Sequence, residues 1–221
     1  MTAESGSARP PVIRSSGVRG NERIGAFSDG VFAIAITLLV LELKVPEHAP
    51  PGGLVQVLPD MLPKIIGHVI SFAVLGLYWV AHHNMFMHIK RHDRILLWLN
   101  ILFLLFVASM PFLAGLLAAY GDDQFAVIAY AMTLVLAGLV LDLIWAYATH
   151  ERRLVDSGLD AHLVAVVHRR VLMAPVIYLL AIGVSFFSLV AAQLVFVLVI
   201  LVYVVPSPLD LHHHKQLGAS E

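Results

Sequence analysis

The sequence contains no cysteine among its 221 residues, and charged side chains make up only 13% of it. Without cysteine the chain has no disulfide, no thiolate metal site and no thiol chemistry, so cysteine usage gives no clue to its compartment. The formal net charge of −1 offers no strongly basic surface. We therefore expect no nucleic-acid partner.

Sequence motifs of common enzyme classes are also missing. There is no G-x-S-x-G, no H-E-x-x-H and no glycine-rich phosphate loop. The acidic pair Asp122 and Asp123 is predicted to lie in an external turn, where water solvates both side chains. Three adjacent histidines, His212, His213 and His214, define no metal geometry outside a fold. We therefore expect no enzymatic activity, no cofactor and no fixed metal ion.

Apolar residues dominate instead, because they make up 59% of the chain and fall into several long runs. A helix of about 20 apolar residues crosses a hydrocarbon core of about 30 Å. These runs are apolar nearly all round, whereas helices of a soluble domain carry polar outer faces. The sequence therefore predicts an all-α, polytopic membrane protein with six transmembrane helices. The spans are predicted at 25–45, 62–88, 94–119, 124–149, 165–187 and 190–206.

The two ends of the chain differ from its middle. Residues 1–22 are rich in Ser, Gly, Pro and Arg and lack a continuous apolar region, so we expect a flexible cytoplasmic tail and not a signal peptide. Residues 23–206 are predicted to form one six-helix transmembrane domain, followed by a cytoplasmic tail at 207–221. The last two spans are marginal in length, because residues 171–205 supply only about 52 Å of helix.

The basic residues indicate the orientation of the spans. Of the 14 Lys and Arg residues, only Lys44 and Lys64 fall on one side of the predicted membrane, which leaves twelve on the other side. Cytoplasmic loops carry the excess of Lys and Arg in membrane proteins. Both termini are therefore predicted to be cytoplasmic.

The first span, RIGAFSDGVFAIAITLLVLEL at 23–43, carries Arg23 and Asp29 in an otherwise apolar segment. An acidic group within a span costs about 2.5 to 3.5 kcal/mol on insertion, so we expect Asp29 to have a partner or a task. Spacing of 100° per residue places one set of side chains on a common stripe and Asp29 on another side, which is expected to face protein. The stripe consists of Arg23, Phe27, Gly30, Ile34, Thr37, Leu38 and Leu41.

The same span carries a recognisable motif, R-x-x-x-F-S-D, formed by Arg23, Phe27, Ser28 and Asp29 and followed by GVFAIAITLLVLELKVP. It resembles the bacterial branch of the transmembrane protein 175 family of potassium channels. The resemblance implies a homotetramer in the plasma membrane, with a central pore lined by the first helix of each subunit. It also implies a pore without the carbonyl filter of classical potassium channels, and the sequence has no TVGYG-like loop.

The resemblance assigns roles to residues of the stripe. It implies a pore constriction at Ile34, Leu38 and Leu41 and a hydroxyl layer at Thr37 that favours potassium, with transient K⁺ near Ile34 and Thr37. Four converging aliphatic side chains leave a narrow apolar neck, which conducts a largely dehydrated ion or empties by dewetting. We therefore expect a leak channel for monovalent cations with weak preference for K⁺ over Na⁺. Aliphatic residues that face lipid or core, and a threonine bonded to its own helix, are the simpler alternatives.

Partners for Arg23 and Asp29 are expected in YWVAHHNMF, near the cytoplasmic end of the second span. The candidates are Trp79, His82, His83 and Asn84, with Asn100 of the third span at a similar depth. The resemblance implies a Trp/His/Asn group packed against the motif, with a structural and gating role. Which of His82 and His83 takes part stays open.

Three other interpretations follow from ionisable residues at membrane depth. Asp29 and Asp142, with Glu42 and His68, could form the relay of a proton-coupled transporter, although the chain has no internal repeat of three spans. His68 and His82 lie 14 residues apart, as in cytochromes with two haems, but no intramembrane histidine remains to face His68. Glu42 is expected either at the outer mouth of the pore or as an interfacial acid.

Overall fold

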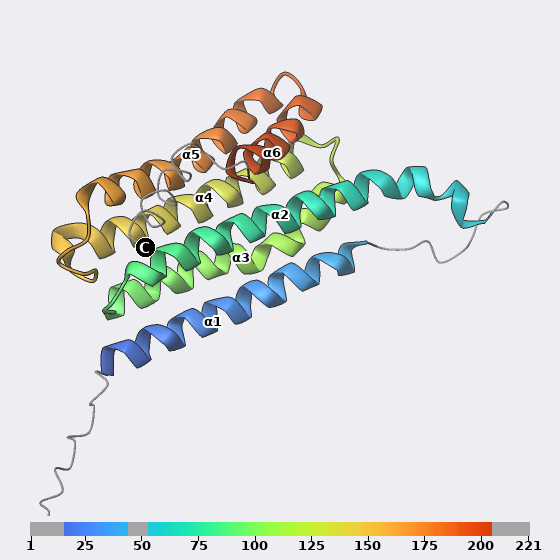
Figure 1. The fold of residues 1–221 in the computed structure, drawn as a ribbon. Coiled ribbons are helices and arrows are strands. Elements are labelled where there is room, and N and C mark those ends of the chain that lie inside the picture. The colour runs from blue at the N-terminus through green and yellow to red at the C-terminus, as the bar shows by residue number, and fades with distance from the viewer. Residues whose placement is uncertain (1–15, 44–52, 205–221) are drawn as a thin grey trace, which may run out of the picture.

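The computed structural model describes residues 16–43 and 53–204. Within these ranges the chain is helical, with an isolated bridge between Ile89 and Val155 and no β-strand. Six α-helices lie side by side in one elongated bundle (Figure 1). They are α1 (Ser16–Leu38), α2 (Leu58–His88), α3 (Arg94–Ala119), α4 (Gln124–Thr149), α5 (Ala161–Ser185) and α6 (Leu189–Val204). Three short 3-10 helices accompany them, η1 (Leu39–Glu42), η2 (Leu54–Gln56) and η3 (His150–Arg152).

The helices correspond to the six predicted spans, and the prediction of an all-α fold is confirmed. α3 and α4 begin and end at the predicted residues. α1 begins at Ser16, so the expected boundary of the N-terminal tail at residue 22 falls inside a helix. Each residue added to an existing helix brings its own hydrogen bond, so a helix can extend beyond its apolar run. The remaining parts of both predicted tails, 1–15 and 207–221, lie outside the described residues.

Five helices in the described ranges are long and apolar enough to cross a membrane, and the sixth is shorter. α6 is apolar throughout but has 16 residues, or about 24 Å of length. α5 begins at Ala161, four residues before the predicted start of its span, and so reaches full length. The shortage of helix expected for the last two spans therefore falls on α6.

Helix packing places α1 at one edge of the bundle. α4 packs against both α3 and α5 and is the most deeply buried of the spans. α1 packs mainly on α3 and α2, and α5 with α6 lies at the opposite edge (Figure 1). One face of α1 therefore packs on the other helices, and the opposite face is left uncovered by them.

Aspartates in the connections set where three of the helices begin. Asp93 accepts a hydrogen bond from the backbone N–H of Leu96, at 2.9 Å, at the start of α3. Asp123 and Asp160 make the equivalent bonds at the starts of α4 and α5, at 2.7 and 2.9 Å. A side-chain acceptor at this position satisfies an N–H that the helix itself leaves unpaired.

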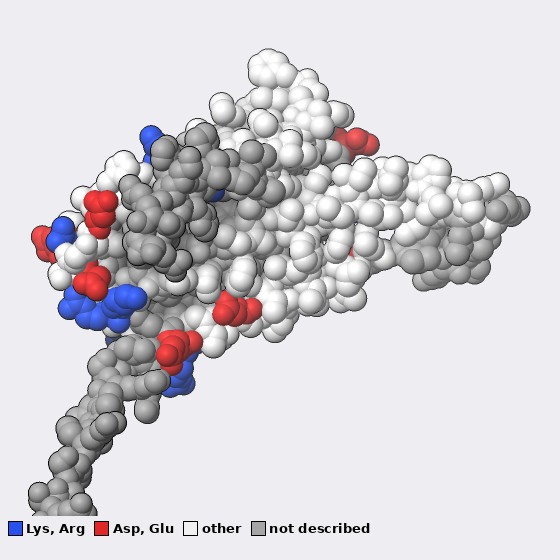
Figure 2. All heavy atoms as spheres, viewed as in Figure 1, with Lys and Arg blue, Asp and Glu red and all other residues white. Residues whose placement is uncertain are grey.

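The end of the bundle where α1 begins is also the end where Lys and Arg side chains gather (Figure 2). Here Asp93 accepts a hydrogen bond from the hydroxyl of Tyr147, at 2.5 Å, and lies 3.6 Å from Nε of Arg153. Partial burial acts to raise the pKa of Asp93, but the bonds from Leu96 and Tyr147 and the charge of Arg153 outweigh it, so its pKa is lower than usual. This cluster joins the start of α3 to the end of α4.

Candidate functional site

α1 has two faces of different character. Its packed face, which η1 continues, consists of five buried side chains spaced three or four residues apart, Ile24, Ser28, Phe32, Ala35 and Leu39. Its opposite face is exposed in the single subunit, with Ile34, Leu38 and Leu41 at 60%, 41% and 66%. Phe27 at 59% and Thr37 are exposed as well. The stripe predicted from helical spacing is therefore the face that the subunit leaves open.

A chain of hydrogen bonds crosses the packed face and links three helices. His82 on α2 contacts the side-chain oxygen of Asn100 on α3 through Nε2, at 2.9 Å. The amide nitrogen of Asn100 donates to the hydroxyl of Ser28, at 3.0 Å, and that hydroxyl donates to the carbonyl of Ile24, at 2.9 Å. Because the oxygen of Asn100 can only accept, Nε2 of His82 must carry the proton. Each of the three side chains is hydrogen-bonded, and all three are buried.

Aromatic rings enclose the imidazole of His82. It stacks on Phe103 with ring centroids 5.4 Å apart and planes 5° apart, and on Phe86 at 4.2 Å and 23°. Phe32 of α1 contacts the same ring at 6.0 Å. A hydrogen bond in such an apolar setting is hard to replace by water, so the arrangement holds α1 in one register. The sequence assigned no role at His82 to these phenylalanines, since an aromatic residue in an apolar span carries no distinguishing signal.

Asp29 lies at the border between the two faces of α1 and has a partner on α2. Nε1 of Trp79 donates to its carboxylate, at 2.8 Å, and the indole stacks on His83 with ring centroids 5.4 Å apart. Trp79 is therefore the direct partner of Asp29. His83 contacts that partner, whereas His82 belongs to the separate chain through Asn100 and Ser28.

Two members of the expected group lie outside these contacts. Arg23 is exposed and makes no ion pair within the described residues, so its expected role in tying α1 to α2 stays a prediction. Asn84 is exposed too, and has no hydrogen bond within the described ranges. Helical spacing gives the reason: Asn84 follows His82 by about 200° around α2 and so faces away from α3.

The hydroxyl of Thr37 bonds to its own helix. It donates to the carbonyls of Ala33 and Ile34, at 2.8 and 2.9 Å. This is the common behaviour of threonine in a helix. Because the proton points back along the helix, the lone pairs of the exposed oxygen stay available on the open face of α1.

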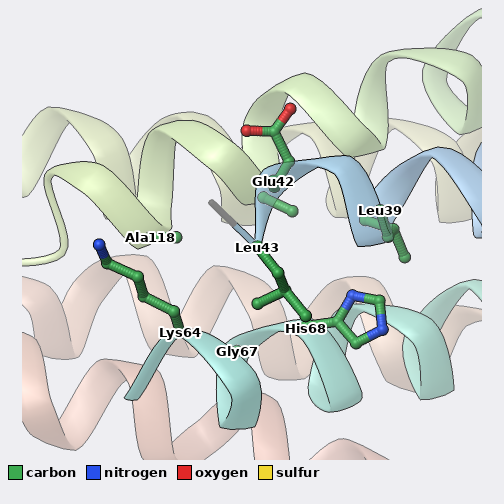
Figure 3. Close-up of a pocket in the computed structure, with 8 residues that line it drawn as sticks. Leu39, Glu42, Leu43, Lys64, Gly67, His68 and Ala118 are labelled. Atoms are coloured by element: carbon green, nitrogen blue, oxygen red, sulfur yellow. The ribbon is translucent and has the colours of Figure 1, made fainter. Parts of the chain in front are cut away.

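The outer end of α1 turns its acidic residue toward α3. A Cβ on Gly115 would lie 2.1 Å from the carboxylate of Glu42, so this side chain lies directly over Gly115. Glu42 also lines a cavity of about 20 Å³, room for one water, together with Leu43, which follows η1, and Lys64 and His68 of α2 (Figure 3). Nδ1 of His68 is buried there and unpaired within the described structure. Of the two expectations for Glu42, the position at the pore mouth is not supported, because the side chain points toward α3.

The acidic residues of the transporter hypothesis lie on different interfaces. Asp142 on α4 contacts Nδ1 of His168 on α5, at 2.7 Å, whereas Asp29 contacts α2. α2 and α3 lie between these two edges of the bundle (Figure 1). A single relay through Asp29 and Asp142 is therefore not supported. The two-haem hypothesis is not supported either, since Nε2 of His82 is already bonded to Asn100.

Comparison with known proteins gives consistent matches. The family model described as "Endosomal/lysosomal potassium channel TMEM175" matches residues 23–111. A potassium channel of Streptomyces collinus is 39% identical over 170 residues, which cover 75% of this chain and 82% of that protein. The human endosomal/lysosomal proton channel TMEM175 is 41% identical over 98 residues, 41% of this chain and 19% of the human protein.

Solved structures match as well. The crystal structure of a lysosomal potassium-selective channel TMEM175 homolog from Chamaesiphon minutus has a TM-score of 0.75 and 34% identity, over 84% of this chain and 96% of that one. The potassium channel MtTMEM175, in a complex with a nanobody fusion, shares the fold with a TM-score of 0.54 and 21% identity.

Proposed function

The chain belongs to the TMEM175 family of potassium channels, and from this premise we propose that it forms a potassium-permeable channel whose pore is lined by α1. It is a multi-pass membrane protein and not an enzyme. The observation that carries the proposal about the pore is the open face of α1, on the side opposite the buried motif serine. That face is exposed over its whole length while Ser28 anchors the other side.

Polar groups on and beside the open face of α1 argue against lipid as its only neighbour. Arg23 and Thr37 on that face are exposed, and so is Asp29 at its border. Charged and polar side chains within spans usually face protein or a water-filled path, because hydrocarbon cannot satisfy them. One helix covers only part of the wall of a central pore, so several copies must surround the axis. We propose four, in a homotetramer.

Ile34, Leu38 and Leu41 are proposed to form the constriction. They are large aliphatic side chains of the open face, about one turn apart along α1 and the η1 turn that continues it. Four copies would close to an apolar neck that passes a largely dehydrated ion or dewets. The free lone pairs of four Thr37 hydroxyls offer weak oxygen ligands beside that neck. They favour the more easily dehydrated K⁺ over Na⁺, and selectivity is expected to be modest because the neck has no ring of carbonyls.

The hydrogen-bond chain through Ser28, Asn100 and His82 is proposed to hold α1 at the angle that keeps this face on the axis. The hydrogen bond from Trp79 to Asp29 is proposed to hold the border of the same face against α2. We place the channel in the plasma membrane because of its likeness to bacterial potassium channels. We place both termini in the cytoplasm because Lys and Arg gather at the end where α1 begins (Figure 2).

Ion flux through purified protein in liposomes tests the pore assignment. Ile34→Asn should wet the neck, raise K⁺ flux several-fold and reduce the preference over Na⁺. Leu180→Asn on α5 is the matched control, because Leu180 is 62% exposed, much like Ile34, but lies at the opposite edge of the bundle. Equal effects of both substitutions, or none, would remove Ile34 from the pore. A proton-sensitive dye in the same liposomes reports whether H⁺ also crosses.

Thr37→Ala tests the hydroxyl layer. Loss of one weak ligand per subunit should lower the K⁺ to Na⁺ permeability ratio by about twofold, or about 0.4 kcal/mol. Thr133→Ala on α4 is the control, because that hydroxyl also bonds to its own helix, at 2.9 Å from the carbonyl of Ala129. An unchanged ratio in Thr37→Ala would show that the hydroxyl does not face the ion.

A further inference from the structure

An open groove between the end of α4 and the start of α5 has no part in the proposed pore. Its volume is about 340 Å³, and its polar lining includes Thr149, His150 and His168. Small residues leave it open, namely Ala146 of α4 and Ala161 and Ala165 of α5. The end of α4 and the start of α5, which line the groove, lie at the end of the bundle where α1 also begins (Figure 1), so in a membrane the groove opens at headgroup depth.

The contacts of its polar residues show what remains for a ligand. The hydroxyl of Thr149 donates to the carbonyl of Trp145, at 2.8 Å, and Nε1 of Trp145 donates to the carbonyl of Val164, at 3.1 Å. Nδ1 of His168 is taken by Asp142 at the deep end, which leaves its Nε2. The side chain of His150 is 75% exposed, with Glu151 at 4.0 Å as its nearest charge. Two imidazole rings are therefore available at the wall of the groove.

A cation lies at the edge of the groove. Arg169 follows Ala165 by one turn of α5 and so borders the same face. It is exposed and makes no ion pair within the described residues. The neighbouring arginines of the α4–α5 connection are engaged, since Arg152 donates to the carbonyl of Ser157 and Arg153 lies beside Asp93. Arg169 thus adds an unpaired positive charge from α5, whereas the acids at the groove lie beside the histidines, Asp142 at His168 and Glu151 at His150.

Exposed apolar side chains continue the two walls toward the middle of the membrane. On α4 they are Leu139 and Leu143, which share a face with Ala146 and His150. On α5 they are Val176 and Leu179, which share a face with Ala161, Ala165 and His168. A polar groove with a cation at the membrane surface therefore leads into an apolar track. This sequence of environments matches an amphiphile better than a soluble anion.

We propose that this groove binds an anionic phospholipid of the adjacent leaflet, with the phosphodiester at Arg169, His168 and His150 and the acyl chains along α4 and α5. Basic pockets between transmembrane helices are suited to such headgroups. The inference depends on the membrane location of the chain and not on the proposed pore, so failure of one leaves the other standing.

Native mass spectrometry of the delipidated full chain tests the proposal, with phosphatidylglycerol and phosphatidylcholine of identical acyl chains as probes. We expect phosphatidylglycerol to be retained preferentially, and Arg169→Gln to weaken its binding about fivefold, as loss of one basic contact at a membrane surface predicts. Ala165→Leu should also reduce binding, because the larger side chain fills the groove. Ala165 is exposed, so the fold should tolerate this change, and an unchanged oligomer mass checks it.

Arg94→Gln is the matched control, because it removes the same charge at the start of α3, at the same end of the bundle, from an exposed position. Its phosphatidylglycerol binding should equal that of the unchanged chain. Equal losses in Arg94→Gln and Arg169→Gln would mean a diffuse surface charge and overturn the site. Binding that survives Ala165→Leu, shows no preference for phosphatidylglycerol, or is displaced by millimolar inorganic phosphate would overturn the proposal of a lipid in the groove.

Discussion

The two halves of the bundle use polar side chains in different ways. Between α1, α2 and α3, side chains bond to side chains, as His82, Asn100 and Ser28 do. Toward α4, α5 and α6, side chains bond mostly to backbone carbonyls, as Trp145 and Gln193 do with Val164 and Gly121. The carbonyl acceptors survive any single substitution, whereas each link of the side-chain network depends on one residue. The half with the proposed pore helix, α1 to α3, therefore depends on specific pairs of side chains. We call the other half, α4 to α6, the scaffold half.

Among the substitutions that test this comparison, Asn100→Leu should have the largest effect on stability and flux. It leaves Nε2 of His82 without an acceptor and Ser28 without its donor, both in a buried site. A buried polar group left unpaired costs about 1 to 3 kcal/mol, so we expect a clear loss of thermal stability together with loss of selective flux. Ser109→Ala, on the same helix but bonded to its own backbone, should leave the melting temperature and flux nearly unchanged. Equal melting temperatures for the two variants would show that the network does not hold α1.

Gly138→Ala tests the scaffold half and should cause the second largest loss of stability. A Cβ at this position on α4 would lie 2.5 Å from Cγ of Pro175 and 3.0 Å from its Cδ. The ring of a proline inside α5 cannot swing aside, so overpacking should cost about 1 to 3 kcal/mol. Gly183→Ala is the control, because its Cβ meets nothing within 4 Å. We expect a lower melting temperature for Gly138→Ala with the K⁺ to Na⁺ ratio preserved. A changed ratio with normal stability would contradict the division between pore and scaffold.

The smallest effect is expected at Asp93, which joins the two halves at the basic end. Its pKa is lowered in the folded chain, so the carboxylate stabilises the fold above its unfolded pKa of about 4. That contribution is lost as the pH falls through the folded pKa. Because the pair with Arg153 is partly exposed, the gain should stay below about 1 kcal/mol. Between pH 6 and pH 3 the melting temperature of Asp93→Asn should fall less than that of the unchanged chain. Equal falls in the two proteins would show that the Asp93 carboxylate does not contribute to stability.

Much of the fold could be predicted because apolar runs are local signals. The starts of α3 and α4 followed from these runs, whereas the caps at Asp93 and Asp123 were found only in the structure. The helical stripe of α1 was also predictable, since 100° per residue places Ile34 and Leu41 on one face whatever their neighbours. The beginning of α1 at Ser16 was not, because a helix can extend into residues that carry no apolar signal.

The sequence predicted which residues lie near the motif, but not which of them contact each other. Trp79, His82 and Asn100 were expected at the depth of Asp29, but depth does not tell which side chain reaches which. The structure pairs Trp79 with Asp29 and sends His82 to Asn100. It leaves Arg23 exposed and turns Glu42 onto Gly115.

The sequence by itself determined the membrane class, the six helices and the residues that share the open face of α1, because hydropathy and helical periodicity are properties of neighbours along the chain. Only the tertiary structure decided which face of α1 is packed, which histidine joins the buried network and where α4 and α5 leave a groove. Those outcomes depend on how helices distant in sequence approach one another. The distance between two helices is set by the volumes of the side chains between them, as where Gly138 lies beneath the ring of Pro175. No single segment of the sequence specifies this fit.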